Sequence, residues 1–166
     1  FSGDPPESGL PREFVGYAGL NVDLFDARLR NRFGYGYTDT DRDNYNPDQV
    51  EQTQTFAALG RNHRLEYQGT FAVTKGVDAV FGIENEVSRF STASSDFVPP
   101  YALGTPARGR AELTSIYGQL NLSPVEGLTL NGGIRHDDHS RFGRQTLFAG
   151  GASWALPTGT VLRASY

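Results

Sequence analysis

Most of the chain alternates apolar and polar residues with a period of two. Because successive side chains of a β-strand point to opposite faces, this period predicts strands with one apolar and one polar face. No period of 3.6 residues persists over helical length, and the pattern predicts about eight strands. The alternating apolar positions are Phe14, Ala18, Leu20, Val22 and Leu24; Leu29, Phe33, Tyr35 and Tyr37; Leu65, Tyr67, Phe71 and Val73; Val77, Ala79, Phe81, Ile83 and Val87; Ile116, Leu120 and Leu122; and Leu128, Leu130 and Ile134.

The connections between these segments alternate between short and long. Tight turns are predicted at residues 23–28, 75–76, 123–127 and 157–159, and longer polar loops at 39–52, 90–110 and 136–144. Long loops at one end and short turns at the other are typical of outer-membrane barrels, whereas a soluble sandwich has no general reason for this asymmetry. Residues 1–13, which are rich in Gly, Pro, Ser and acid, are predicted to be an irregular lead-in, and 14–166 the β segment.

The last part of the chain predicts a hairpin followed by an incomplete strand. Residues 132–157 alternate, break at a charged loop and alternate again, and 159–166 begin a further strand that stops before any turn signal. We therefore expect an all-β fold, an antiparallel up-and-down transmembrane β-barrel of which about eight strands form one segment. A complete small eight-stranded outer-membrane barrel with a structural role and a soluble antiparallel β binding module are the alternatives.

Composition narrows the class of protein. Of 166 residues, 37% are hydrophobic, 12% are aromatic and 20 are Gly, and no apolar run approaches the roughly 20 residues of a transmembrane helix. Insertion into a membrane would therefore require a barrel. Fifteen basic and nineteen acidic residues give a net charge of −4, which predicts neither a nucleic-acid partner nor a polybasic membrane patch. The absence of Cys excludes disulfides and thiolate sites.

Two clusters of polar residues invite a metal or acid–base interpretation. Asp39, Asp41, Asp43 and Asp48 place oxygens at close spacing, as a calcium site would. They lack the central Gly and terminal Glu of an EF-hand loop, so a solvated loop without a cofactor is the preferred interpretation. His136, Asp137, Asp138 and His139 combine imidazole and carboxylate, but consecutive strand residues point to opposite sides.

The sequence predicts no enzyme. Ser115, Ser140 and Ser153 lack the G-x-S-x-G setting of a hydrolase nucleophile, and no residue is assigned to catalysis, to a cofactor or to a metal. The polar face of the strands is expected to line a hydrated lumen, and some aromatic residues to form interfacial girdles. The lumen residues are Arg30, Arg32, Glu66, Gln68, Glu84 and Glu86, and the girdle residues are Tyr35, Tyr37, Tyr117, Trp154 and Tyr166.

Residues 132–143, followed by 154–166, resemble the barrel of TonB-dependent outer-membrane receptors of the cobalamin and siderophore type. Residues 82–86 and 115–120 are also similar to strands of that barrel. The resemblance implies a barrel of about 22 strands around a plug domain. It also implies uptake of an iron chelate (siderophore) or cobalamin through the bacterial outer membrane.

The same resemblance implies the partners. The barrel would contact outer-membrane lipid, and a plug segment, expected before Phe1 and absent from this sequence, would engage the TonB energy-coupling protein. The residues do not identify the ligand. They also leave open whether this segment closes on itself, pairs with another copy or belongs to a longer chain.

Overall fold

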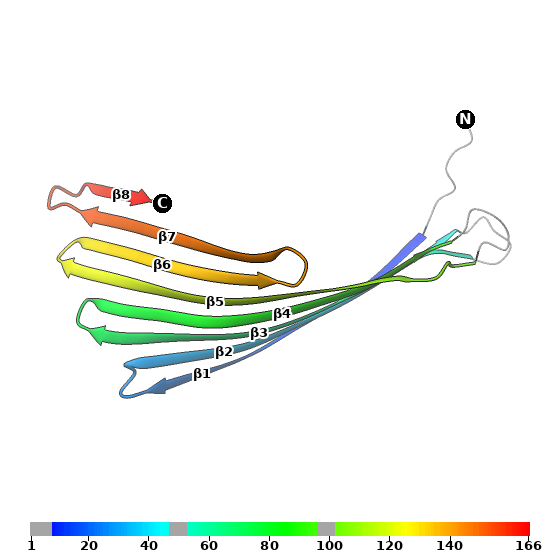
Figure 1. The fold of residues 1–166 in the computed structure, drawn as a ribbon, viewed down its shortest axis with the longest axis horizontal. Helices are drawn as coiled ribbons and strands as arrows, with labels where there is room; N and C mark the ends of the chain where they lie inside the picture. Colours follow the sequence, from blue (N-terminus) through cyan, green and yellow to red (C-terminus); the bar gives the residue numbers. More distant parts are fainter. Residues whose placement is uncertain (1–7, 47–52, 96–101) are drawn as a thin grey trace. The chain divides into compact units, whose positions relative to one another are not determined.

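Eight β-strands form one antiparallel up-and-down sheet (Figure 1). The protein is represented by a computed structural model that describes residues 8–46, 53–95 and 102–166. The strands are β1 (Ser8–Leu24), β2 (Leu29–Asn46), β3 (Thr53–Thr74), β4 (Val77–Ser94), β5 (Ala107–Val125), β6 (Leu128–His139), β7 (Gly143–Ala155) and β8 (Val161–Ser165). The predicted all-β, up-and-down fold is confirmed.

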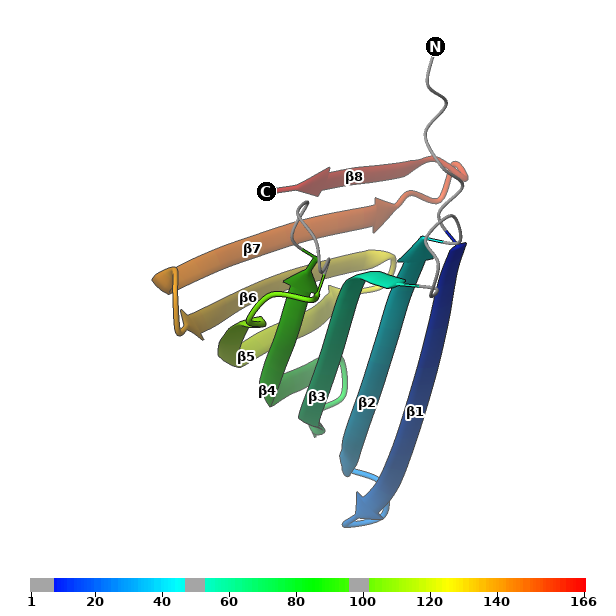
Figure 2. The ribbon, with the colours of Figure 1, turned by 90° about the vertical axis from the view of Figure 1, so that its right-hand side faces the viewer.

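Each strand pairs with its neighbour in sequence, so the order across the sheet is β1 to β8 (Figure 2). Among the described residues β1 and β8 lie at opposite ends of this order and are not paired. The sheet is therefore not closed, as expected for a segment of a larger barrel. The structured residues contain no helix long and apolar enough to cross a membrane.

The Cα positions divide the described chain into two units, and the long strands contribute to both. The first unit draws on the described residues within 1–17, 36–63 and 87–111, and the second on 18–35, 64–86 and 112–166. The second unit contains all of β6, β7 and β8 and the parts of β1 to β5 that adjoin the tight turns.

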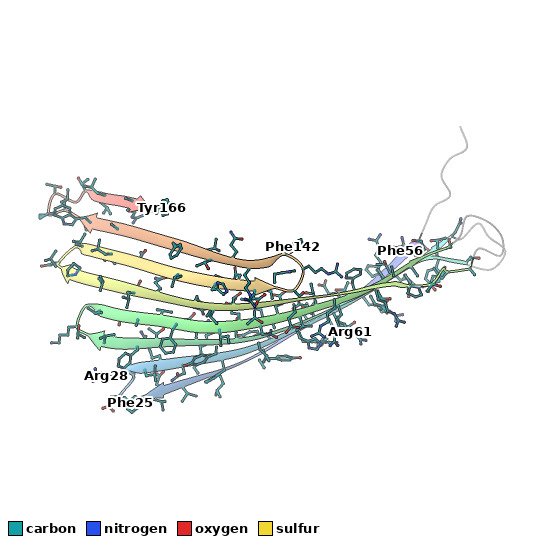
Figure 3. The ribbon with its side chains drawn as sticks, viewed as in Figure 1. Phe25, Arg28, Phe56, Arg61, Phe142 and Tyr166 are labelled. Atoms are coloured by element: carbon teal, nitrogen blue, oxygen red, sulfur yellow. The ribbon has the colours of Figure 1, made fainter. Side chains whose placement is uncertain are left out.

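The tight turns lie where the sequence places them. Residues 25–28, 75–76 and 126–127 form turns between strands. Gly76 and Gly127 have φ of 79° and 78°, a conformation that glycine adopts without a steric penalty. The first turn instead has Phe25, Asp26 and Ala27 at positive φ, and Figure 3 labels Phe25 and Arg28 at this turn.

The strands extend well into the segments predicted as loops. β1 begins at Ser8 within the expected lead-in, β2 continues to Asn46, and β4 to Ser94. The third expected loop is a short turn at residues 140–142. Of the other two loops, residues 47–52 and 96–101 lie outside the described residues. Residues 102–106 lie between β4 and β5, and Leu103 pairs with Ser95 in an isolated bridge.

The predicted bounds of the loops were wrong for a physical reason. A strand whose two faces both contact water needs no apolar alternation, so its polar sequence resembles that of a loop. Pro11 contributed to the prediction of an irregular lead-in, because proline lacks the N–H group that a paired strand uses. However, β1 is an edge strand of the described sheet, where proline is tolerated.

The apolar side chains of the second unit do not form a shared core. Ala93, which belongs to the first unit, is the one buried hydrophobic residue in the described part of the chain. The registers of β5 to β7 place alternate large apolar side chains on one face, where Leu122, Leu128 and Leu130 are half-buried and the others are exposed. We call this the apolar face. It includes Leu20, Phe33, Leu65, Phe81, Ile83, Ile116, Leu120, Ile134, Phe148, Trp154 and Leu162.

Candidate functional site

The opposite face of the second unit carries a row of ion pairs. Arg32 lies 3.8 Å from Glu66, which also contacts Arg64 at 3.5 Å. Arg64 then reaches Glu84 at 3.2 Å, and Arg135 contacts the second oxygen of Glu84 at 3.0 Å. Positive and negative groups therefore alternate across β2, β3, β4 and β6. We call this the polar face.

Arg135 contacts four residues of the polar face. Its guanidinium donates hydrogen bonds to Asp137 (2.8 Å), Glu84 (3.0 Å) and Ser115 (2.9 Å). It also lies 5.9 Å from the centre of the Tyr117 ring. Ser115 is only 1% exposed, and the Arg135 side chain is 35% exposed. The three hydrogen bonds are charge-assisted, so they fix the orientation of the arginine.

Pairing register brings these residues together. In the β5–β6 ladder Ser115 lies opposite Asp137, and Tyr117 lies opposite Arg135. Directly opposite residues of an antiparallel pair share a face and contact each other. The arrangement provides a wall of paired charges whose side chains are held in fixed positions by hydrogen bonds.

The predicted lumen residues are found on this face in part. Arg32, Glu66 and Glu84 are ion-paired, and Gln68 accepts a hydrogen bond from the Tyr117 hydroxyl at 3.3 Å. Glu86 is half-buried on β4, and Arg30 is exposed on β2. Sequence reasoning missed the contributions of Arg64, Ser115, Arg135 and Asp137.

The girdle prediction needs one correction. Tyr117 lies on the polar face, where its ring is next to Arg135 and its hydroxyl bonds Gln68. Tyr117 alternates in the sequence with Ile116 and Gly118 of the apolar face, and this alternation indicated that its side chain lies on the polar face. Trp154 lies on the apolar face opposite Leu162 of β8 and is exposed, as are Tyr35 and Tyr166.

The four residues of 136–139 do not converge. Asp137 bonds Arg135, whereas Asp138 bonds Arg144 at 2.8 Å in the β6–β7 hairpin. His136 contacts Thr146, and the His139 ring accepts hydrogen bonds from backbone N–H groups of the 140–142 turn. The described residues contain no group of three or more His, Asp or Glu side chains placed to hold a metal ion.

Three of the four aspartates considered as a calcium site, Asp39, Asp41 and Asp43, lie on β2. Asp39 accepts hydrogen bonds from Tyr37 (2.8 Å) and Arg61 (2.8 Å). Asp43 accepts a hydrogen bond from Gln54, and Asp48 lies outside the described residues.

A glycine lets the Tyr117 ring reach the polar face. A Cβ atom at Gly82 would lie 2.5 Å from the ring and 2.5 Å from the backbone oxygen of Tyr67. We expect Gly82→Ala to lower the free energy of unfolding by about 1–3 kcal/mol, as overpacking does. Gly132 has open space around its Cβ position, so Gly132→Ala is the matched control and should leave stability unchanged or slightly higher. Denaturant unfolding of both variants tests this expectation, and equal losses would contradict it.

The first unit contains a groove of about 590 Å³ lined by four arginines. Arg61 of β3, Arg89 of β4, and Arg108 and Arg110 of β5 form its charged wall. Sequence reasoning did not single out these residues, because they are far apart in the chain and the net charge is negative.

Comparison with known proteins identifies the architecture. The family model described as TonB dependent receptor-like, beta-barrel matches residues 3–166. The siderophore receptor PirA from Pseudomonas aeruginosa has a similar structure, with a TM-score of 0.65 and 20% sequence identity. The match covers 95% of this chain but 26% of PirA, so this chain spans about a quarter of the length of that receptor. No curated protein matches the sequence.

Proposed function

Because the chain belongs to the TonB-dependent receptor β-barrel family, we propose that it forms part of the wall of an outer-membrane receptor that takes up a metal chelate. The ligand class is an iron chelate or cobalamin. The proton-motive force would supply the energy for uptake, and the TonB protein would relay it to a part of the receptor other than these strands. The family is one of receptors and transporters rather than of enzymes.

The two unlike faces of one sheet carry this proposal. The apolar face is exposed along neighbouring strands, whereas the polar face holds connected ion pairs. In an outer-membrane barrel the lipid-facing side is apolar and the lumen is polar. A soluble sandwich would need a second layer over the apolar face, and the described residues provide none.

Strand length agrees with the same interpretation. A tilted strand crosses the hydrocarbon core in about 9–11 residues. β2 to β5 have 18, 22, 18 and 19 residues, so each is long enough to cross and to continue into water. A complete eight-stranded barrel would require β1 to pair with β8, and the described strand order does not include that pair.

Uptake in cells tests the proposed function. The full-length protein would be expressed in a bacterium that lacks its own iron-chelate and cobalamin receptors, with and without a functional TonB protein. We expect TonB-dependent accumulation of either a radiolabelled ferric siderophore or labelled cobalamin, and the chelate that accumulates identifies the ligand class. Accumulation of neither across a panel of ferric siderophores, with the protein folded in the outer membrane, would refute the proposal.

A further inference from the structure

The arginine groove of the first unit has positive charge without matching negative charge. Arg61 is paired with Asp39, and Arg110 also makes an interaction. Within residues 8–46, 53–95 and 102–166, Arg89 and Arg108 have neither an ion pair nor a side-chain hydrogen bond. Among the described residues no carboxylate lines the groove, whose other residues are Leu59, Phe90, Ser91 and Gly109. The groove therefore favours an anion.

The groove lies beside a row of aromatic rings. The centre of the Tyr37 ring lies 5.0 Å from that of His63 and 6.1 Å from that of Phe14, and the rings are tilted against one another. Asp39 lies two residues from Tyr37 on β2, and Arg61 two residues from His63 on β3, so the Asp39–Arg61 pair shares the face of these rings. Figure 3 labels Arg61, which belongs both to this pair and to the groove.

The order of residues along β1 identifies this face as the one turned to the membrane. Phe14 belongs to the alternating apolar series that continues through Leu20 and Leu24, and in the proposed receptor such a series faces lipid. Aromatic rings next to arginines are typical of the boundary between hydrocarbon and headgroups, where rings stay partly apolar and guanidinium groups reach the anionic layer. An iron chelate bound in the lumen would contact the other face.

We propose that the groove lined by Arg61, Arg89, Arg108 and Arg110 binds the phosphate groups of an anionic lipid in the outer leaflet of the membrane. Guanidinium groups bind phosphate oxygens through paired hydrogen bonds. Leu59, which is exposed at 46%, supplies an apolar contact beside the charged wall. Bound lipid would hold the receptor at a fixed depth in the membrane.

A lipid-binding measurement on the full-length protein tests the proposal. The protein, purified in detergent and freed of lipid, would be titrated with bisphosphorylated lipid A, and bound lipid counted by native mass spectrometry. We expect the R89Q/R108Q variant to bind lipid A about thirtyfold more weakly than the wild type does, because the variant loses the electrostatic attraction that each of the two arginines contributes near a lipid surface. The matched control is R30Q/R42Q, which removes two exposed arginines from other positions on β2 and should bind as the wild type does.

Three results would overturn the proposal. The first is a loss of lipid A affinity in R30Q/R42Q equal to that in R89Q/R108Q. The second is binding of dephosphorylated lipid A by the wild type as tight as that of bisphosphorylated lipid A. The third is displacement of the lipid by an equimolar concentration of inorganic phosphate, which would indicate a site for free phosphate. Folding would be checked by the shift in gel mobility on boiling. If R89Q/R108Q does not fold, R89K/R108K keeps both charges but loses the paired hydrogen bonds, and it should still bind several-fold more weakly than wild type.

Discussion

Leu120→Arg is expected to destabilise the protein in a lipid bilayer by about 2–4 kcal/mol. Leu120 lies on the apolar face of β5 and is 51% exposed, with Gly132 opposite it on β6. In the proposed receptor it lies near the middle of the membrane-crossing part of the strand. A guanidinium group at that depth either remains in hydrocarbon or forces the bilayer to deform, and both cost free energy.

The neighbouring residue provides the control. Gln119 points to the polar face, opposite Gly133, and Gln119→Arg places the same charge at the same depth in a hydrated lumen. Reversible unfolding of the full-length protein in vesicles should therefore show a loss for Leu120→Arg and little change for Gln119→Arg. Equal losses, or a larger loss for Gln119→Arg, would contradict the assignment of the two faces.

Arg135→Met is expected to lower the free energy of unfolding by about 2 kcal/mol, because hydrogen bonds to charged groups contribute about 1.5–3 kcal/mol and partial exposure reduces that contribution. Methionine retains an apolar chain of similar length but donates no hydrogen bond. Glu84 and Asp137, whose side chains are 19% and 23% exposed, would each lose a cationic partner. Ser115, which is buried, would lose its acceptor role toward Arg135.

An exposed pair in the same hairpin calibrates this loss. Arg144 contacts Asp138 at 2.8 Å, with the two side chains 74% and 47% exposed, and Arg144→Met should change stability by less than about 1 kcal/mol. Urea unfolding at low and high salt would compare the two variants. The Arg144 effect should disappear at high salt and the Arg135 effect should largely remain. Equal, fully salt-sensitive effects would show that the polar face is an ordinary solvated surface.

The sequence predicted the faces of the strands better than their ends. Alternation alone assigned Phe81, Ile83 and Ile134 to one face and Glu84 and Gln68 to the other, and the structure agrees. The ends were wrong where polar residues occupy both faces of a strand. At residues 39–46, for example, the polar sequence indicated a loop although the backbone is paired as a strand.

The charged network could be anticipated only in part. Individual residues such as Arg32 and Glu84 follow from alternation, but the contact of Arg135 with Glu84 joins residues 51 apart and depends on the pairing register of three strands. Local pattern sets a side chain's face, whereas register sets its neighbour. The arginine groove was missed for the same reason, since Arg61, Arg89 and Arg108 come together only through strand pairing.

The opposition of Tyr117 to Arg135 and of Leu120 to Gly132 also bears on how such a protein assembles. A slip of one residue between β5 and β6 would turn every side chain of one strand to the other surface. Arg135 and Asp137 would then be forced into hydrocarbon, and Ile134 into water. The bilayer therefore disfavours misaligned hairpins during insertion. A single-layered sheet without a packed core has no buried side chains that would disfavour them.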